Sequence, residues 1–372
     1  MMTYIITFTL SIMISFIYEH RSNRRKGDLQ GTVLLFLLVI ILSLVAGCRS
    51  PQLGTDNIVY YDTFKVACNS DLNTVLLFNQ SKLESFETGF MILVWVISRL
   101  GDSFFWFCFI TSLITNSLFI IGMKYYEDRY SFTLEVICYL FLFYCPFINY
   151  VRQGVALGIC FFAWRYVDSK KWLKYLLLII LASTIHIGSI ISLPIYYILS
   201  RNKDIKFDKK TVLIILGVLA VVVGGPKLMA SALEYASGLG IRSWTLQKYA
   251  RRFLEWGRYS FIPTHLLQVL PQLVLATLVY RKHINKDRTF VSLYLMIIIQ
   301  FMFILMGSVY QNFSRIGLFY GIANILMIPE LTKSVKNSEI LVLAYGFAYW
   351  MFFSVFNHYG FSSAVYPYIS SF

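Results

Sequence analysis

Charged residues are scarce in this sequence. Only 14% of its 372 residues are charged, 58% are hydrophobic, and the mean hydropathy is +0.64. A soluble globular domain carries about a quarter charged residues, so this composition excludes an ordinary soluble fold. Apolar runs recur along the whole chain, and several approach the roughly 20 residues that span a bilayer. They are continuous rather than alternating, which predicts an all-α polytopic integral membrane protein instead of a β-barrel.

Several motifs that carry chemistry are also missing. The six cysteines form no CxxC pair, which argues against a zinc or redox site. The sequence contains no Gly-rich phosphate loop, no HExxH and no GxSxG. We therefore expect no cofactor. Cys48 and Cys68 fall in one predicted outer loop, where a disulfide and two isolated cysteines are both open readings.

Acidic residues are fewer than basic ones, which leaves a net charge of +14. In a soluble protein this excess would indicate nucleic acid. Here much of it lies in short loops at 21–26, 165–174, 201–210 and 281–288, where it fixes orientation and meets anionic lipid. These loops are predicted to be cytoplasmic. The first apolar segment has basic residues only after it, so it is predicted to be a retained helix with its N-terminus outside.

The apolar runs predict about twelve transmembrane helices within one domain, 1–372, with both termini outside. Two long outer loops cover about 47–87 and 225–261. The segment 88–100 is short for a span, and we expect an interfacial helix there. The predicted spans are 3–18, 31–46, 104–123, 131–147, 150–167, 172–185, 187–200, 211–224, 262–280, 290–306, 312–330 and 338–354.

Two short apolar segments meet at His186, in "WLKYLLLIILASTIHIGSIISLPIYYILS". Thr184, Gly188, Ser189 and Pro194 loosen the helix there, and backbone freed at membrane depth must be satisfied by protein or water. A histidine at such a break could act as a general base or bind a phosphate. The alternative is a neutral histidine bonded to a helix carbonyl.

Arginines open two predicted helices on the outer side. In "NYVRQG" Asn149 is expected to cap the helix, which places Arg152 in a first turn that already favours anions. The guanidinium adds a planar fork suited to phosphate oxygens. Asn312 and Arg315 repeat the spacing, so the two openings predict two halves of a diphosphate clamp. The alternative is that each arginine reaches lipid headgroups or pairs with an outer acid.

The outer loops hold further polar candidates. Cations outnumber acids in the second loop, against the positive-inside trend, which indicates an anionic ligand. Asp56 could activate a sugar hydroxyl or bind a divalent metal, although its G-T-D-N setting is also ordinary turn chemistry. Glu87 begins the interfacial helix, where a negative residue is expected in any case. The second loop's cations are Lys227, Arg242, Lys248, Arg251, Arg252 and Arg258.

Three stretches carry a resemblance to a known family: "GCRSPQLGTDNIVYYDTF", "ESFETGF" and the segment from "NYVRQGVALG" to "STIHIGS". In order and spacing they resemble the EpsG family of bacterial exopolysaccharide and capsule polymerases, which are Wzy-like membrane proteins. One departure is Cys48, where the family more often has an apolar residue. Arg315 is similar to a further basic position of the family. The matching positions are Arg49, Gly54, Thr55, Asp56, Tyr60, Glu87, Gly89, Phe90, Arg152, Gln153 and His186.

The resemblance implies a GT-C-like glycosyltransferase architecture in the bacterial inner membrane. Oligosaccharide repeat units linked to undecaprenyl diphosphate would be joined on its outer face to make exopolysaccharide, capsule or O-antigen. The growing chain is the donor, and its lipid diphosphate leaves. The implied partners are this lipid-linked oligosaccharide, membrane lipid, and the flippase and chain-length regulator of the same pathway. Nucleic acid is not expected.

The residues then take expected roles. Arg152 and Arg315 bind the diphosphate, helped by Arg49 and by Arg251, Arg252 and Arg258 of the second loop. Asp56 or His186 takes the proton of the acceptor hydroxyl. Tyr60, Glu87 and Gln153 complete the substrate site, and no metal site is expected. The alternative functions are a lipid-linked oligosaccharide flippase, which should hold polar residues near the bilayer midplane, and a membrane acyltransferase, which should place an acid beside its histidine.

Overall fold

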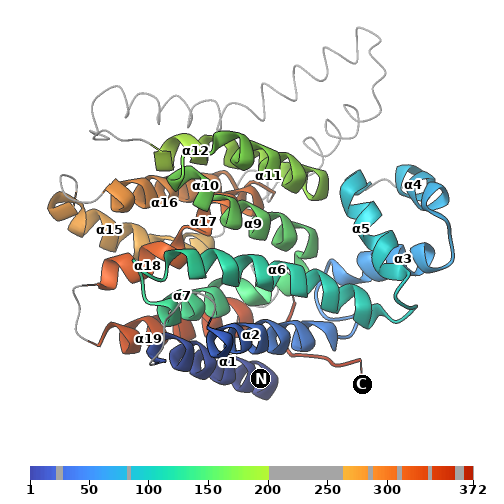
Figure 1. Ribbon diagram of the computed structural model, residues 1–372, viewed down its shortest axis with the longest axis horizontal. Helices are drawn as coiled ribbons and strands as arrows, with labels where there is room; N and C mark the ends of the chain where they lie inside the picture. Colours follow the sequence, from blue (N-terminus) through green and yellow to red (C-terminus); the bar gives the residue numbers. More distant parts are fainter. Residues whose placement is uncertain are drawn as a thin grey trace, which may run out of the picture. The chain divides into compact units, whose positions relative to one another are not determined.

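A computed structural model describes residues 1–21, 28–81, 85–200, 263–283, 288–307, 312–333, 337–356 and 364–371 (Figure 1). By its internal packing the chain divides into two compact units. The first comprises Met1–Ser200 and Asn324–Phe372, and the second comprises Arg201–Ala323. The single domain over 1–372 stays a prediction.

The described parts of both units are helical. The first unit begins with α1 (Met2–His20), α2 (Leu29–Gly47), α3 (Asn57–Cys68), α4 (Leu72–Ser81), α5 (Thr88–Ser98) and α6 (Phe104–Tyr126). It continues with α7 (Phe132–Tyr139), a π-helical segment (Leu140–Tyr144), α8 (Cys145–Asn149), α9 (Val151–Ala163), α10 (Arg165–Asp168), α11 (Trp172–Ile185), a 3₁₀ helix (Ile187–Ser192) and α12 (Leu193–Ser200). Its C-terminal part contains α18 (Asn324–Thr332), α19 (Ser338–Trp350) and a second π-helical segment (Met351–Phe356). The second unit contains a 3₁₀ helix (Pro263–Gln268), α15 (Leu270–His283), α16 (Arg288–Gly307) and α17 (Asn312–Gly321).

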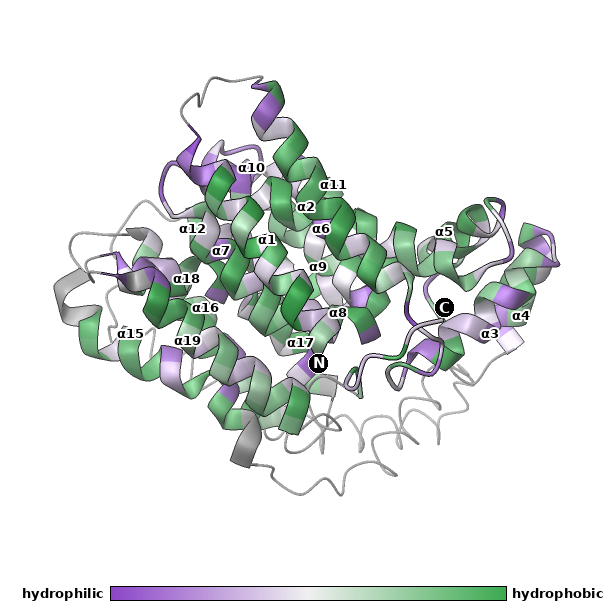
Figure 2. Cartoon of the chain, turned by 90° about the horizontal axis from the view of Figure 1, so that it is seen from below, coloured by the Kyte–Doolittle hydropathy of each residue, from purple (hydrophilic) through white to green (hydrophobic). Residues whose placement is uncertain are grey.

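Six helices in the described ranges are long and apolar enough to cross a membrane. One of them, Phe132–Asn149, is completely buried, whereas only a third of α1 and of α2 is buried. The α7 part of this central span packs against α1, α6, α18 and α19. Figure 2 shows hydrophobic residues along the faces of the long helices. This chain is therefore a multi-pass membrane protein, because exposed apolar helix faces are stable in lipid. The six are Met2–His20, Leu29–Gly47, Phe104–Tyr126, Phe132–Asn149, Thr289–Gly307 and Glu339–Phe356.

These six correspond to the predicted spans 3–18, 31–46, 104–123, 131–147, 290–306 and 338–354. The predicted total of twelve is not confirmed. The predicted span 312–330 is divided by a turn at 322–323 into α17 and α18. The predicted spans 172–185 and 187–200 are short apolar helices in the structure, as is the predicted interfacial segment 88–100, and 211–224 lies outside the described residues.

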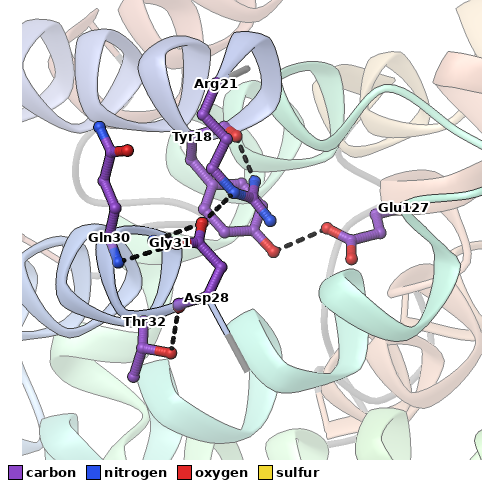
Figure 3. Close-up of polar contacts among 7 residues, drawn as sticks. All are labelled: Tyr18, Arg21, Asp28, Gln30, Gly31, Thr32 and Glu127. Atoms are coloured by element: carbon purple, nitrogen blue, oxygen red, sulfur yellow. Dashed lines mark hydrogen bonds and ion pairs between the residues drawn. The ribbon is translucent and has the colours of Figure 1, made fainter. Parts of the chain in front are cut away.

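Polar groups tie helix ends together at one end of the first unit (Figure 3). Asp28 accepts hydrogen bonds from two backbone N–H groups of α2 and forms an ion pair with Arg21 at 2.9 Å. The Tyr18 hydroxyl donates to Glu127 at 2.7 Å, which joins the ends of α1 and α6. Arg129 pairs with Asp168 at 3.3 Å. These contacts tie Arg21 and Asp168, from loops that were predicted to be cytoplasmic, to the start of α2 and the end of α6.

A short C-terminal segment forms hydrogen bonds with the residues that follow α2. Ser50 N donates to Ile369 O at 2.8 Å, and Gly54 N donates to Ala364 O at 3.1 Å. Arg49 and Ser370 form an isolated β-bridge. The segment 364–371 therefore holds the residues between α2 and α3, which include the predicted G-T-D element.

Candidate functional site

An ion pair between Arg152 and Glu87 lies at the centre of the candidate site. Arg152 is in the first turn of α9, as predicted, and its Nη1 donates to Glu87 Oε2. Its guanidinium carbon lies 4.3 Å from the centre of the Phe86 ring and 5.9 Å from that of Phe90. The two charged side chains are 23% and 19% exposed. A ligand can therefore reach the pair, although aromatic rings shield much of it.

Glu87 also binds the backbone at the predicted helix break. Ile187 N donates to Glu87 Oε1 at 2.9 Å. α11 ends at Ile185, His186 is extended, and its Nδ1 accepts from Gly188 N at 3.0 Å. The interruption at His186 is thus confirmed. One carboxylate links the start of α5, the start of α9 and the turn beside His186.

The close contact between α5 and α11 explains the glycine at position 89 in "ETGF". A Cβ at this position would contact Thr184 Oγ1 and would lie 2.7 Å from the Thr184 carbonyl oxygen. No side-chain carbon fits at that distance from a backbone atom. The missing side chain therefore allows α5 to approach α11 closely, and this approach lets Glu87 reach Ile187 N.

Tyr60 forms an aromatic wall behind the ion pair. Only 4% of Tyr60 is exposed, and its ring centre lies 5.5 Å from that of Phe86 and 5.8 Å from that of Phe90. Its hydroxyl contacts the Arg152 guanidinium. The structure thus brings Tyr60, Glu87 and Arg152 together, three residues that the sequence analysis assigned to one substrate site. The role of Phe86 was missed, because an aromatic next to a glutamate carries no signal until its arginine partner is known.

Asp56 lies at the start of α3, and Asn149 holds it there. Asp56 N donates to Asn149 Oδ1 at 2.8 Å, and Asn149 Nδ2 donates to Thr55 Oγ1 at 3.2 Å. The expected role of Asn149 as the cap of α9 was wrong. It is the last residue of α8, its amide is engaged by the G-T-D element, and α9 begins after Tyr150 without a side-chain cap. Gly54 has φ +91°, and a Cβ there would lie 2.5 Å from Asn149 Oδ1.

Arg49 is almost completely enclosed, with 1% of its surface exposed. Its Nη1 donates to Ala46 O at 2.8 Å and its Nη2 donates to Asn57 Oδ1 at 3.3 Å. It therefore joins the end of α2 to the start of α3, next to Asp56. Gln153 is likewise buried, with 3% exposed. For both residues, the burial favours a positioning role over direct contact with a bulky ligand.

Other predicted site residues lie elsewhere. Arg315 is in the first turn of α17, as its spacing indicated, but it belongs to the second unit, and its pairing with Arg152 stays a prediction. The second-loop arginines Arg251, Arg252 and Arg258 lie outside the described residues. Over the described ranges, no group of three or more His, Cys, Asp or Glu side chains could hold a metal ion. Cys48 and Cys68 are both free thiols.

Replacing Asn149 with Ala should loosen the loop that holds Asp56. Asn149 is fully buried, and its loss leaves the backbone N–H of Asp56 without this acceptor. A buried polar group that loses its partner costs about 1–3 kcal/mol. We expect a lower free energy of unfolding by that amount and weaker polymer formation. Thermal unfolding in detergent measures the first, and a gel of cell-surface glycan measures the second.

The control for this change is Asn69→Ala. Asn69 is exposed, and its side-chain amide donates to the nearby Lys65 carbonyl at 3.0 Å. Surface substitutions of this kind change stability by about 0.5 kcal/mol or less. Equal effects of Asn149→Ala and Asn69→Ala would contradict the role given to Asn149.

The chain has apolar membrane-spanning helices and a shielded charged pair at their ends. It therefore belongs to the class of multi-pass helical membrane proteins with a polar site at one end of the bundle. Within that class the family can be named. The EpsG family model matches residues 32–370, and the chain belongs to the EpsG family. No curated protein and no solved structure matches this chain significantly. The family suggests a polymerase of the glycosyltransferase type that acts on a lipid-linked glycan.

Proposed function

We propose that this protein is a Wzy-type polysaccharide polymerase of the bacterial inner membrane. It joins oligosaccharide repeat units carried on undecaprenyl diphosphate at the outer face of that membrane. The observation that carries the proposal is the partly exposed guanidinium of Arg152 at the start of α9, beside Tyr60, in a chain of the EpsG family. Arg152 pairs with Glu87, the kind of outer acid that the alternative expected, and a diphosphate would have to replace that partner. An arginine at a helix start, partly open to ligand, suits the diphosphate of such a donor.

The chemistry follows from the donor. The acceptor hydroxyl attacks the first sugar of the growing chain, and the lipid diphosphate leaves with additional negative charge. Arg152 stabilises that charge through its planar fork and the N-terminal dipole of α9. Because the leaving group arrives with the donor, the reaction needs no nucleotide site.

The experiment that tests this function compares the lipid-linked glycans of a deletion strain with those of its parent on a gel. A polymerase predicts that the ladder collapses to a single repeat unit on the cell surface, and that the plasmid-borne gene restores the ladder. Repeat units of normal composition trapped on the cytoplasmic face would instead identify a flippase. A normal ladder that lacks only acyl groups would identify an acyltransferase.

A further inference from the structure

The two oxygens of Glu87 are both engaged in the structure. Oε2 accepts from Arg152 Nη1, and Oε1 accepts from Ile187 N at 2.9 Å. From this arrangement we propose that Glu87 is the proton acceptor of the polymerisation, and that it is released for this role when the lipid diphosphate displaces it from Arg152. The inference rests on the proposed function and adds a catalytic residue and an order of events to it.

Exchange on Arg152 follows from the chemistry of the guanidinium. Glu87 already occupies an N–H group that a diphosphate would bind, so the two anions compete for one fork. A diphosphate carries more charge and more oxygens than one carboxylate. Because the Phe86 ring lies against the guanidinium, Arg152 can stay in place while its ligand changes.

When the diphosphate displaces Glu87 from Arg152, the Glu87 carboxylate becomes able to accept a proton. Its Oε1 remains held by Ile187 N, which keeps the carboxylate beside the site, while Oε2 loses its cationic partner. The Arg152 Nη1–H no longer occupies Oε2, so this oxygen is open to the proton of an acceptor hydroxyl. The base thus becomes competent only after the donor's diphosphate is bound, which prevents activation of an acceptor before a donor is present.

The proposed step transfers the glycan to the acceptor and one proton to Glu87. The acceptor O–H bond breaks, and its proton moves to Glu87 Oε2. The acceptor oxygen forms a bond to C1 of the donor sugar, and the C1–O bond to the diphosphate breaks. The bonding electron pair stays on the diphosphate oxygen, next to Arg152. No metal or additional reactant is required.

The other two candidates for the base are placed less favourably. His186 Nδ1 already accepts from Gly188 N, so this nitrogen is engaged with the backbone. Asp56 belongs to the network around Asn149, and its Oδ1 accepts from the Thr55 hydroxyl at 3.1 Å. Glu87 directly contacts Arg152, the arginine that is proposed to bind the leaving group.

The test uses Glu87→Gln in the full-length protein, with undecaprenyl diphosphate as the binding probe. The glutamine oxygen can still accept from Ile187 N, which keeps the side chain in place, but its neutral amide competes weakly for Arg152. We expect undecaprenyl diphosphate to bind about 10-fold more tightly and chain growth to fall about 100-fold or more, as for loss of a general base. Exposed Glu339 provides the control, and Glu339→Gln should change neither quantity.

Each outcome discriminates. Tighter binding with normal chain growth would overturn the role as base, and lost growth with unchanged binding would overturn the exchange. If Glu87→Gln fails to insert into the membrane, Glu87→Asp is tested in its place. We expect this variant to bind undecaprenyl diphosphate with near-parental affinity. Its chain growth should be about 10-fold slower, because the shorter acid reaches the acceptor poorly. Parental growth in Glu87→Asp would contradict the inference. If the wild-type protein binds no undecaprenyl diphosphate, the proposed function itself fails.

Discussion

Arg152→Ala should abolish chain growth while the protein still inserts into the membrane. Removal of one group that stabilises charge in a transition state typically lowers the rate by about 10²–10³. Arg152→Lys should recover little, because a lysine cannot form the planar fork. The glycan ladder of a complemented deletion strain measures growth, and an immunoblot of washed membranes measures insertion. A normal ladder from Arg152→Ala would contradict the diphosphate clamp.

Two further variants separate chemistry from stability. Arg152→Ala leaves Glu87 without its cation, and a largely buried acid without a partner destabilises the fold. The double variant Arg152→Gln with Glu87→Gln removes both charges, so we expect near-parental thermal stability without chain growth. Arg129→Ala is the matched control, because Arg129 is 49% exposed and its pair with Asp168 is worth about 0–1 kcal/mol. Its ladder should match that of the parent.

Gly89→Val should cause the second large loss. The new side chain would meet the carbonyl oxygen of Thr184, a backbone atom that cannot turn aside. α5 would then move away from α11, and Glu87 would lose its contact with Ile187 N. Overpacking of this kind costs about 1–3 kcal/mol, and displacement of Glu87 should lower chain growth about 10-fold or more. Thermal unfolding and the glycan ladder measure the two effects.

Gly158→Ala provides a matched control within the same unit. A Cβ at Gly158 in α9 would lie 3.2 Å from Cβ of Leu118, a tight contact that a small shift relieves. We expect a much smaller loss of stability and a normal ladder. If Gly158→Ala proves as damaging as Gly89→Val, the close approach of α5 and α11 has no special importance for the site.

The local patterns of the sequence were sufficient for some features. The break at His186 followed from small, polar and Pro residues between two apolar segments. Arg152 was also placed correctly in a first turn, although the cap from which this position was inferred was wrong. Asn149 shows where this reasoning stops. Its spacing before Arg152 is that of a helix cap, but its amide binds the loop before α3 instead. A cap is inferred from neighbouring residues, and nothing in the neighbourhood of Asn149 indicates a competing partner in another loop.

The amino-acid sequence by itself determined that this is a polytopic helical membrane protein, because long apolar runs with few charges are stable as helices in lipid whatever their partners. It also indicated the EpsG family, through the order and spacing of three stretches. Only the tertiary structure decided how they are used. It enclosed Arg49 as a link between α2 and α3, and it joined Glu87 to Arg152 and to the turn beside His186. Those contacts connect distant parts of the chain, and they depend on how the helices pack rather than on any local preference.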